Sequence, residues 1–178
     1  MTPRTSLRWR LRDATSGAHA RLDARVGGAF DDPAGYAAFL RGMHAFVATA
    51  ARVTGDGALV ASQAALTADL ADLGLDAAPP AAVARADAGA ALGWRYVAAG
   101  ASLGARVLLP RAQGLGFDAR HGARYLALQA ASGAWRELIP ELEVVSSRDE
   151  TAAAVAGAHA AFSCAEAAMA EAFDAVHA

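Results

Sequence analysis

Apolar side chains recur every three or four residues along most of this chain, the spacing that places them on one face of an α-helix. In the first such segment, Thr5 is the expected N-cap of a helix that runs to about Arg25 and is ended by Gly27 and Gly28. The repeating apolar positions are Leu11, Ala14, Ala18, Leu22 and Val26. The chain is therefore expected to open on an amphipathic helix.

Two further helices are expected in the next fifty residues. Asp32 followed by Pro33 is typical of an N-cap and the first position of a helix, and a Gly-Asp-Gly triplet breaks that second helix. A third helix is predicted over residues 58–73, where Gly74 ends it. The apolar side of the second helix consists of Tyr36, Phe39, Leu40, Met43, Phe46 and Val47.

Loop signals separate the remaining helices. Residues 76–82, with two consecutive prolines, predict a loop, and a fourth helix is expected over 83–109 with Pro110 as its end. After a Gly-Leu-Gly turn, Asp118 is the expected cap of a fifth helix that Gly133 bends or splits.

The last helix is predicted over residues 149–176, after a connection at 140–148. Its inward positions are Val155, Phe162, Met169 and Phe173. The pattern as a whole predicts an all-α protein, a single domain over residues 1–178 that packs five to seven helices into one bundle.

Composition supports a helical globular chain. It has 178 residues, of which 52 are alanine, the best helix former, and 55% are apolar against 19% charged. The net charge of -2 predicts no nucleic-acid partner. Because the chain has no apolar run of about 18 residues and no secretory pattern over residues 1–12, we expect no membrane partner and a cytoplasmic location.

The first helix carries a candidate site. Arg12, His19 and Asp23 are seven and four residues apart, so they share one helix face. A hydrogen bond from one imidazole nitrogen to Asp23 would leave the other nitrogen as a neutral metal ligand, and Arg12 could meet an acidic edge of the same cofactor. The alternative is a surface ion pair beside a half-buried histidine.

Two glycines inside the fourth helix indicate a second part of this site. Gly100 and Gly104 each cost a helix about 1 kcal/mol relative to alanine, so something must approach the backbone there. A flat ligand lying across both glycines is one explanation, and tight helix-helix contact is the other. With His19, the first explanation predicts a planar metal cofactor between two helices.

These segments resemble a known family. Residues 11–23, Leu-Arg-Asp-Ala-Thr-Ser-Gly-Ala-His-Ala-Arg-Leu-Asp, are similar to the opening of bacterial heme oxygenases, especially the compact type associated with bacterial phytochromes. Residues 96–104, Tyr-Val-Ala-Ala-Gly-Ala-Ser-Leu-Gly, resemble the distal-helix segment of that group. Later segments follow in the expected order, at Tyr125-Leu126, Trp135-Arg136 and 158–162.

The resemblance implies the heme-oxygenase-like helical fold and a role for each matching residue. His19 would be the proximal ligand of the heme iron, Asp23 its hydrogen-bond partner and Arg12 a propionate contact. Gly100 and Gly104 would let the distal helix bend and lie close over the heme. The other implied site residues are Ser102 as a catalytic position in the distal segment, Arg95 and Tyr96 as heme contacts, Arg136 as a second propionate-binding arginine and Phe162 as an aromatic wall.

The implied activity uses heme as both cofactor and substrate. A neutral histidine ligand suits O2 activation, and the implied products are biliverdin, CO and ferrous iron. The implied partners are heme, an external electron donor such as a ferredoxin or reductase, and a photoreceptor that accepts the bilin.

Two departures from the family pattern lie in the distal segment. Ala105 stands where a second glycine usually follows, and its methyl group is expected to narrow the distal cleft. Ala101 stands where some members carry an acidic residue. Both keep open a non-catalytic heme- or bilin-binding protein on the same fold.

Other chemistries find less support in the sequence. A thiaminase-like hydrolase would need an acidic, cysteine-based pocket, whereas Cys164, the only cysteine, is expected to be a small core residue. Ser102 has no evident general base, and no Glu-x-x-His pair for a di-iron site occurs.

Overall fold

The computed structural model describes residues 6–144 and 147–176, and it confirms the all-α class. None of the helices in these ranges combines the length and apolar character needed to cross a membrane. The helices are α1 (Leu7–Val26), α2 (Pro33–Thr54), α3 (Gly57–Asp72), α4 (Ala88–Gly114), α5 (Arg124–Ala131), α6 (Ala134–Glu143) and α7 (Arg148–Asp174).

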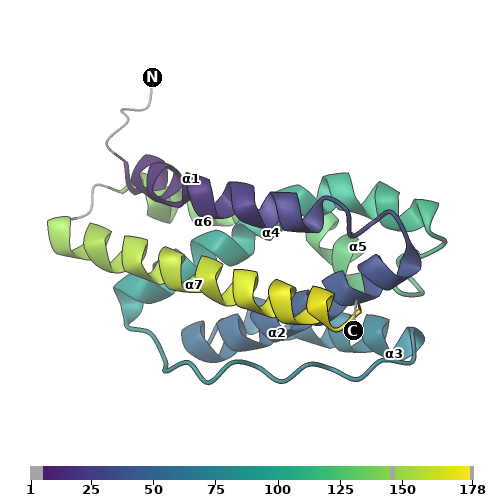
Figure 1. The fold of residues 1–178 in the computed structure, drawn as a ribbon. Helices are drawn as coiled ribbons and strands as arrows, with labels where there is room; N and C mark the ends of the chain where they lie inside the picture. The colour runs from purple at the N-terminus through teal and green to yellow at the C-terminus, as the bar shows by residue number, and fades with distance from the viewer. Residues whose placement is uncertain (1–5, 145–146, 177–178) are drawn as a thin grey trace.

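The last helix is the centre of the bundle. α7 packs against α1, α2 and α4, as Figure 1 shows, while α3 and α5 lie on the far sides of α2 and α4. All seven helices contribute side chains to one cluster of buried apolar residues. Because α1 and α4 both rest on α7, the two helices of the candidate site share one support.

Several helix ends agree with the sequence signals. The Asp32 carboxylate accepts a hydrogen bond of 2.7 Å from the Gly35 amide, and Gly55 ends α2 with a φ of 70°. Gly133 separates α5 from α6 as expected. The expected cap Thr5 lies outside the described residues, and the N-cap of α1 is Ser6.

The fourth helix begins five residues later than predicted. Two hydrogen bonds to α2 hold the preceding segment extended, and Asp87 then caps α4 through the Ala90 amide at 2.8 Å. The two bonds run from the Ala81 amide to the Thr49 hydroxyl at 2.9 Å and from the Ala86 amide to the Val53 carbonyl at 3.1 Å. Local alanine-rich sequence favours helix here, but contacts with α2 decide the conformation.

Two prolines expected to end helices lie inside them instead. α4 continues through Pro110 to Gly114, and α6 continues through Pro140 to Glu143. A proline within a helix leaves the carbonyl four residues earlier without its usual partner. Both prolines are exposed, so water can satisfy that carbonyl, and the predicted ends at these positions are wrong.

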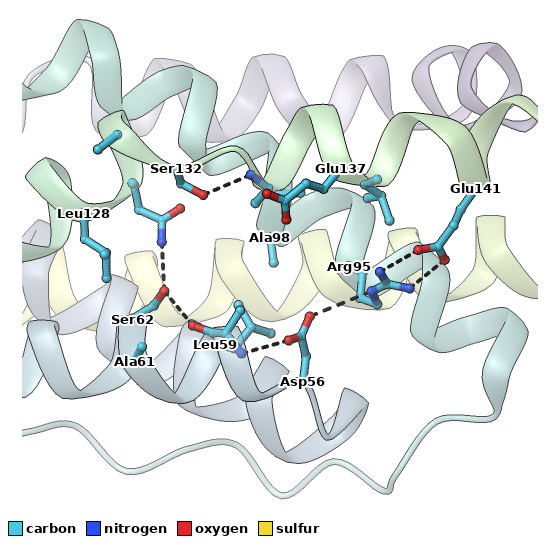
Figure 2. A pocket seen from close by; sticks show the side chains of 16 residues that line it. Asp56, Leu59, Ala61, Ser62, Arg95, Ala98, Leu128, Ser132, Glu137 and Glu141 are labelled. Carbon is cyan, nitrogen blue, oxygen red and sulfur yellow. Dashed lines mark hydrogen bonds and ion pairs between the residues drawn. The ribbon is translucent and has the colours of Figure 1, made fainter.

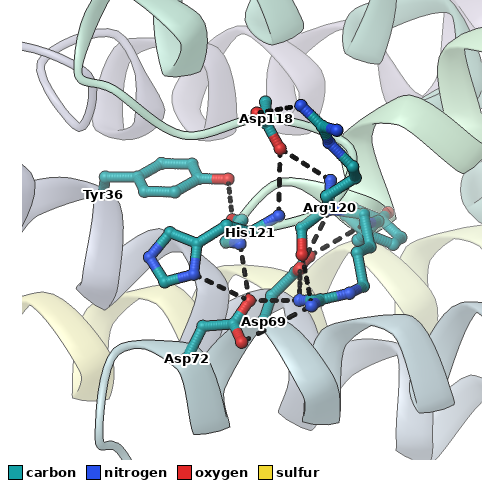
Figure 3. Close-up of polar contacts among 9 residues, drawn as sticks. Tyr36, Asp69, Asp72, Asp118, Arg120 and His121 are labelled. Carbon is teal, nitrogen blue, oxygen red and sulfur yellow. Dashed lines mark hydrogen bonds and ion pairs between the residues drawn. The ribbon is translucent and has the colours of Figure 1, made fainter.

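The predicted cap of α5 was Asp118, in the turn before the helix, but the cap comes from another helix. Asp118 binds the amides of residues 120–121 and orders the turn before α5 instead of capping the helix. The carboxylate of Asp69, on α3, accepts hydrogen bonds of 2.9 Å from the amides of Arg124 and Tyr125 (Figure 3). Asp69 is fully buried, so this cap joins α3 to α5 within the core.

The crossing of α4 and α7 depends on two glycines. A Cβ atom placed on Gly93 would lie 2.0 Å from the Ala154 carbonyl oxygen, and one placed on Gly157 would lie 2.1 Å from the Ala90 carbonyl oxygen. No other residue fits such a close approach of two backbones. Within α4, the glycine that allows close packing against another helix is therefore Gly93.

Candidate functional site

The histidine on α1 is oriented by its predicted partner. His19 Nδ1 lies 2.8 Å from Asp23 Oδ2, one helical turn further along. This contact leaves Nε2 available to a metal or a hydrogen-bond donor. The side chains of His19 and Asp23 are 64% and 68% exposed, so the pair stands at an accessible surface.

An aromatic side chain from α7 lies beside this histidine. The Phe162 ring makes an edge contact with the imidazole, with 6.0 Å between the ring centroids. Phe162 is buried, with 4% of its surface exposed, so the imidazole rests against the core on one edge. The predicted grouping of His19 and Phe162 is thus present.

A second group of polar residues lies two turns earlier on α1. The Arg12 guanidinium lies over the Trp9 ring, 5.1 Å from its centroid, and makes no ion pair within the described residues. Tyr96, on α4, shares a hydrogen bond with the Thr15 hydroxyl and packs against the Trp135 ring. Burial raises the pKa of Tyr96, and the Thr15 hydrogen bond and nearby arginines partly offset this effect. An unpaired cation is therefore held near the point where α1 meets α4.

The two predicted distal glycines face open space. A Cβ atom placed on Gly100 or on Gly104 would have no atom within 4 Å outside its own helix surroundings. Tight helix-helix contact is therefore excluded as the reason for these glycines, in contrast to Gly93. Leu103 and Val107 lie on the same stretch of α4 and are 43% and 68% exposed. This part of α4 offers an apolar surface to a ligand.

Ser102 and Ala105, beside these glycines in the sequence, are directed into the core. Ser102 is 1% exposed, and its hydroxyl donates a hydrogen bond of 2.7 Å to the Ala99 carbonyl. Ala105 is also 1% exposed. The structure therefore does not present the Ser102 hydroxyl to a ligand, and the Ala105 methyl group lies in the core and does not narrow a cleft.

The structure does not bring Arg95 to His19. Arg95 lies five residues before Gly100, so its side chain leaves α4 about 140° around the helix from the side on which Gly100 faces open space. Arg95 instead forms a two-bonded ion pair with Glu141, at 2.7 and 2.9 Å, and lies 3.8 Å from Asp56. In this structure the Arg95 side chain therefore pairs with carboxylates on a different face of α4.

That face carries a separate concave pocket of about 520 Å³. Figure 2 shows Arg95, Glu141 and Asp56 at one end and Ser62 near the other. The pocket is lined by residues of α3, α4, α5 and α6, by Asp56 just before α3 and by Ser132 between α5 and α6, and no residue of α1 borders it. It is therefore distinct from the surface around His19.

Arg136 remains apart from the other predicted residues. It is exposed on α6, beside Gly133 and Glu137, and makes no hydrogen bond or ion pair within the described residues. Its side chain is free to bind an anion.

The described residues include no group of three or more metal-binding side chains. His44 is buried, and its two ring nitrogens contact the Ala78 carbonyl and the Thr67 hydroxyl. Burial raises the pKa of the Cys164 thiol, which disfavours a reactive thiolate. A single histidine ligand such as His19 therefore needs a cofactor that supplies the other ligands to its metal.

The residues proposed for the heme site fit that group in these respects. One imidazole nitrogen of His19 is available to a metal. The α4 backbone faces open space at Gly100 and Gly104, which a Cβ atom would partly fill. Arg12 is an unpaired cation on the same face of α1 as His19. Thr15 and Trp9 contact Tyr96 and Arg12, and neither is among the site residues predicted from the sequence. Thr15 lies one turn before His19, and that spacing was the available signal.

Comparison with known proteins agrees with this fold. No protein-family model and no curated protein matches the sequence. The solved structure of the NO- and CO-bound heme oxygenase from Neisseria meningitidis is similar, with a TM-score of 0.75 and 27% sequence identity, over 95% of this chain and 92% of that one. The all-α fold and the near-complete coverage of both chains show that this protein has a heme oxygenase-like fold.

Proposed function

We propose that this protein is a heme-degrading oxygenase that converts heme to biliverdin, CO and ferrous iron with O2 and electrons from an external donor. The observation that carries the proposal is the imidazole of His19, oriented by Asp23 at 2.8 Å, on a fold that also leaves the α4 backbone open at Gly100 and Gly104. The similarity to a heme oxygenase structure supports it.

Different residues would bind different parts of the heme. His19 would ligate iron through Nε2, because Nδ1 is directed to Asp23. Arg12 and Arg136 would bind the propionates and so oppose rotation of the ring in its plane. Phe162 would support the imidazole, and Tyr96 would join α4 to α1 beside Arg12.

Heme bound there would supply the redox-active iron and the porphyrin ring that is opened. The distal glycines would leave space above the ring, and their exposed backbone would allow hydrogen bonds from amides or water. Because the Ser102 hydroxyl is already bonded to the Ala99 carbonyl, we assign it no proton transfer. The proposed electron donor is a ferredoxin or reductase, and the proposed bilin acceptor is a photoreceptor.

A non-catalytic heme or bilin carrier is the second candidate. It is favoured by Ala101, which offers no carboxylate to order water where some members of the family have an acidic residue. Ala105 does not favour the carrier, because its buried methyl group does not narrow a cleft.

A hemin titration tests both candidates. We expect a Soret band on adding hemin to the purified protein, and loss of most of its intensity in His19→Ala, because His19 is the proposed ligand of the heme iron. His121→Ala is the matched control, since His121 also lies near a carboxylate, 3.5 Å from Asp72, but elsewhere in the fold.

Turnover then separates the enzyme from the carrier. With a reductant and O2, an oxygenase replaces the Soret band with the spectrum of biliverdin, whereas a carrier keeps it. If wild-type protein forms no Soret band, both heme proposals are wrong.

A further inference from the structure

An arginine on α4, Arg111, binds the C-terminal end of α1. Arg111 Nη2 donates a hydrogen bond of 2.9 Å to the Gly27 carbonyl, at the C-cap of α1. The same nitrogen lies 3.3 Å from Asp31 Oδ1, and the guanidinium lies over the Phe30 ring, 5.1 Å from its centroid. Phe30 is buried, so one face of the guanidinium rests on the core.

This contact adjoins the helical turn that carries the partner of His19. The Gly27 amide donates to the Asp23 carbonyl at 2.8 Å, while the Asp23 carboxylate holds His19 Nδ1. Hydrogen bonds of Arg111, Gly27 and Asp23, together with the backbone of Gly27 and Asp23, therefore connect α4 with the imidazole.

The last turn of α1 has little else to stabilise its outer side. Ala24, Arg25, Gly27 and Gly28 are exposed, and the two consecutive glycines favour fraying. A cation at a helix C-terminus opposes fraying, because it bonds a free carbonyl and interacts favourably with the helix dipole.

We propose that Arg111 is a positioning residue that holds the last turn of α1 in place and thereby keeps Asp23 bonded to His19. This inference rests on the proposed function for its significance, since the oriented imidazole is the suggested heme ligand. The hydrogen bonds themselves exist without heme, so the inference has a test that is independent of it.

The test compares Arg111→Met with Arg106→Met in the full-length, heme-free protein. Arg106 is a matched control on the same helix, because its Nε donates to a different backbone carbonyl, that of Ala130 on α5, at 3.3 Å. Long-range 1H–15N spectra of the neutral imidazole report which ring nitrogen of His19 carries the proton, with His19→Gln identifying the signal. Amide hydrogen exchange reports fraying of residues 24–28.

We expect wild type to show the Nδ1–H form of His19, and Arg111→Met to show a mixture of both forms. We expect the exchange of amides 24–28 to become about five- to tenfold faster, as for the loss of one ordinary hydrogen bond at the protein surface. Arg106→Met should change neither measurement. Arg111→Lys, which keeps the charge but not the geometry, should lie between wild type and Arg111→Met and remains informative if the methionine variant does not fold.

A resonance Raman measurement extends the test to the hemin-loaded, reduced protein. Weaker bonding of Asp23 to His19 should lower the iron–histidine stretching frequency in Arg111→Met but not in Arg106→Met.

Two results would overturn the inference: a His19 proton on Nε2 in wild type, or equal behaviour of the Arg111 and Arg106 variants. If wild type does not bind hemin while Arg111→Met changes the His19 proton position, the proposed function fails and the positioning role stands. If wild type binds hemin while Arg111→Met leaves the heme-free protein unchanged, the positioning role fails and the proposed function stands.

Discussion

At the scale of single residues, the candidate site divides into contacts made within one helix and contacts made between helices. The His19–Asp23 bond joins residues four apart, so helix periodicity alone predicts it. The contacts of Tyr96 with Thr15 and of Phe162 with His19 join residues that are 81 and 143 positions apart in the sequence. Arg95 pairs with Glu141 on another face of α4, and a shift of one residue in the predicted register turns a side chain about 100° around the helix.

The open backbone at Gly104 leads to a prediction in which stability and binding change in opposite directions. Gly104→Leu should raise the free energy of unfolding by roughly 0.5–1 kcal/mol, because leucine is a better helix former and meets no atom within 4 Å at Cβ. Hemin affinity should fall at least about tenfold, because the side chain fills the space proposed for the ring. Urea unfolding and hemin titration measure the two effects.

Gly114→Ala provides the control, since Gly114 also faces open space but lies at the end of α4. It should leave hemin affinity unchanged. Equal hemin affinity in wild type and Gly104→Leu would contradict placing the ring against this part of α4.

At the scale of helices, the sequence signals identify most of the elements and misplace some of their ends. The capping signal at Asp32 is local and is confirmed. The cap of α5 is not local, because Asp69 lies 55 residues before the amide of Arg124 that it binds. Pro110 ends no helix, because its exposed position allows water to replace the missing helical bond.

The α4–α7 crossing predicts a large loss of stability from a small substitution. Gly157→Ala should lower the free energy of unfolding by about 2–4 kcal/mol, because the new methyl group would meet the Ala90 backbone, which cannot move as a side chain can. Thermal and urea unfolding measure the loss.

Gly17→Ala on α1 is the matched helical substitution. The nearest atom to its Cβ would be the flexible end of Arg21 at 3.7 Å, so this variant should be as stable as wild type or up to about 1 kcal/mol more stable. Similar losses in both variants would show that general helix effects, and not the crossing, determine stability.

At the scale of the whole molecule, carboxylates that join separate helices predict the response to acid. The hydrogen bond from Arg124 and that from the Gly122 amide hold the pKa of Asp72 below its ordinary value of 3.8. Its stabilising contribution is therefore complete above about pH 5 and is lost as the pH falls through the lowered pKa. The pH dependence of Asp69 has the opposite sign. Burial raises the pKa of Asp69, so its contribution to stability declines as the pH rises through the raised pKa.

We therefore expect Asp72→Asn to be less stable than wild type at pH 7, with a smaller loss of stability between about pH 5 and pH 2.5. Urea unfolding at a series of pH values measures this difference. Asp174→Asn, at the exposed end of α7, should follow the wild-type curve. Parallel pH curves for wild type and Asp72→Asn would show that the Asp72 bonds do not contribute to acid sensitivity.

The sequence by itself determined the helical class, the number of helices within its predicted range and the pairing of His19 with Asp23. These features depend on apolar periodicity and on contacts within one or two helical turns, which are properties of local sequence. Only the tertiary structure decided that Gly93 serves helix packing while Gly100 and Gly104 face open space, because all three glycines look alike along one helix. It also decided that Arg95 belongs to another pocket and that Arg111 reaches the end of α1, because such contacts depend on which helices pack together.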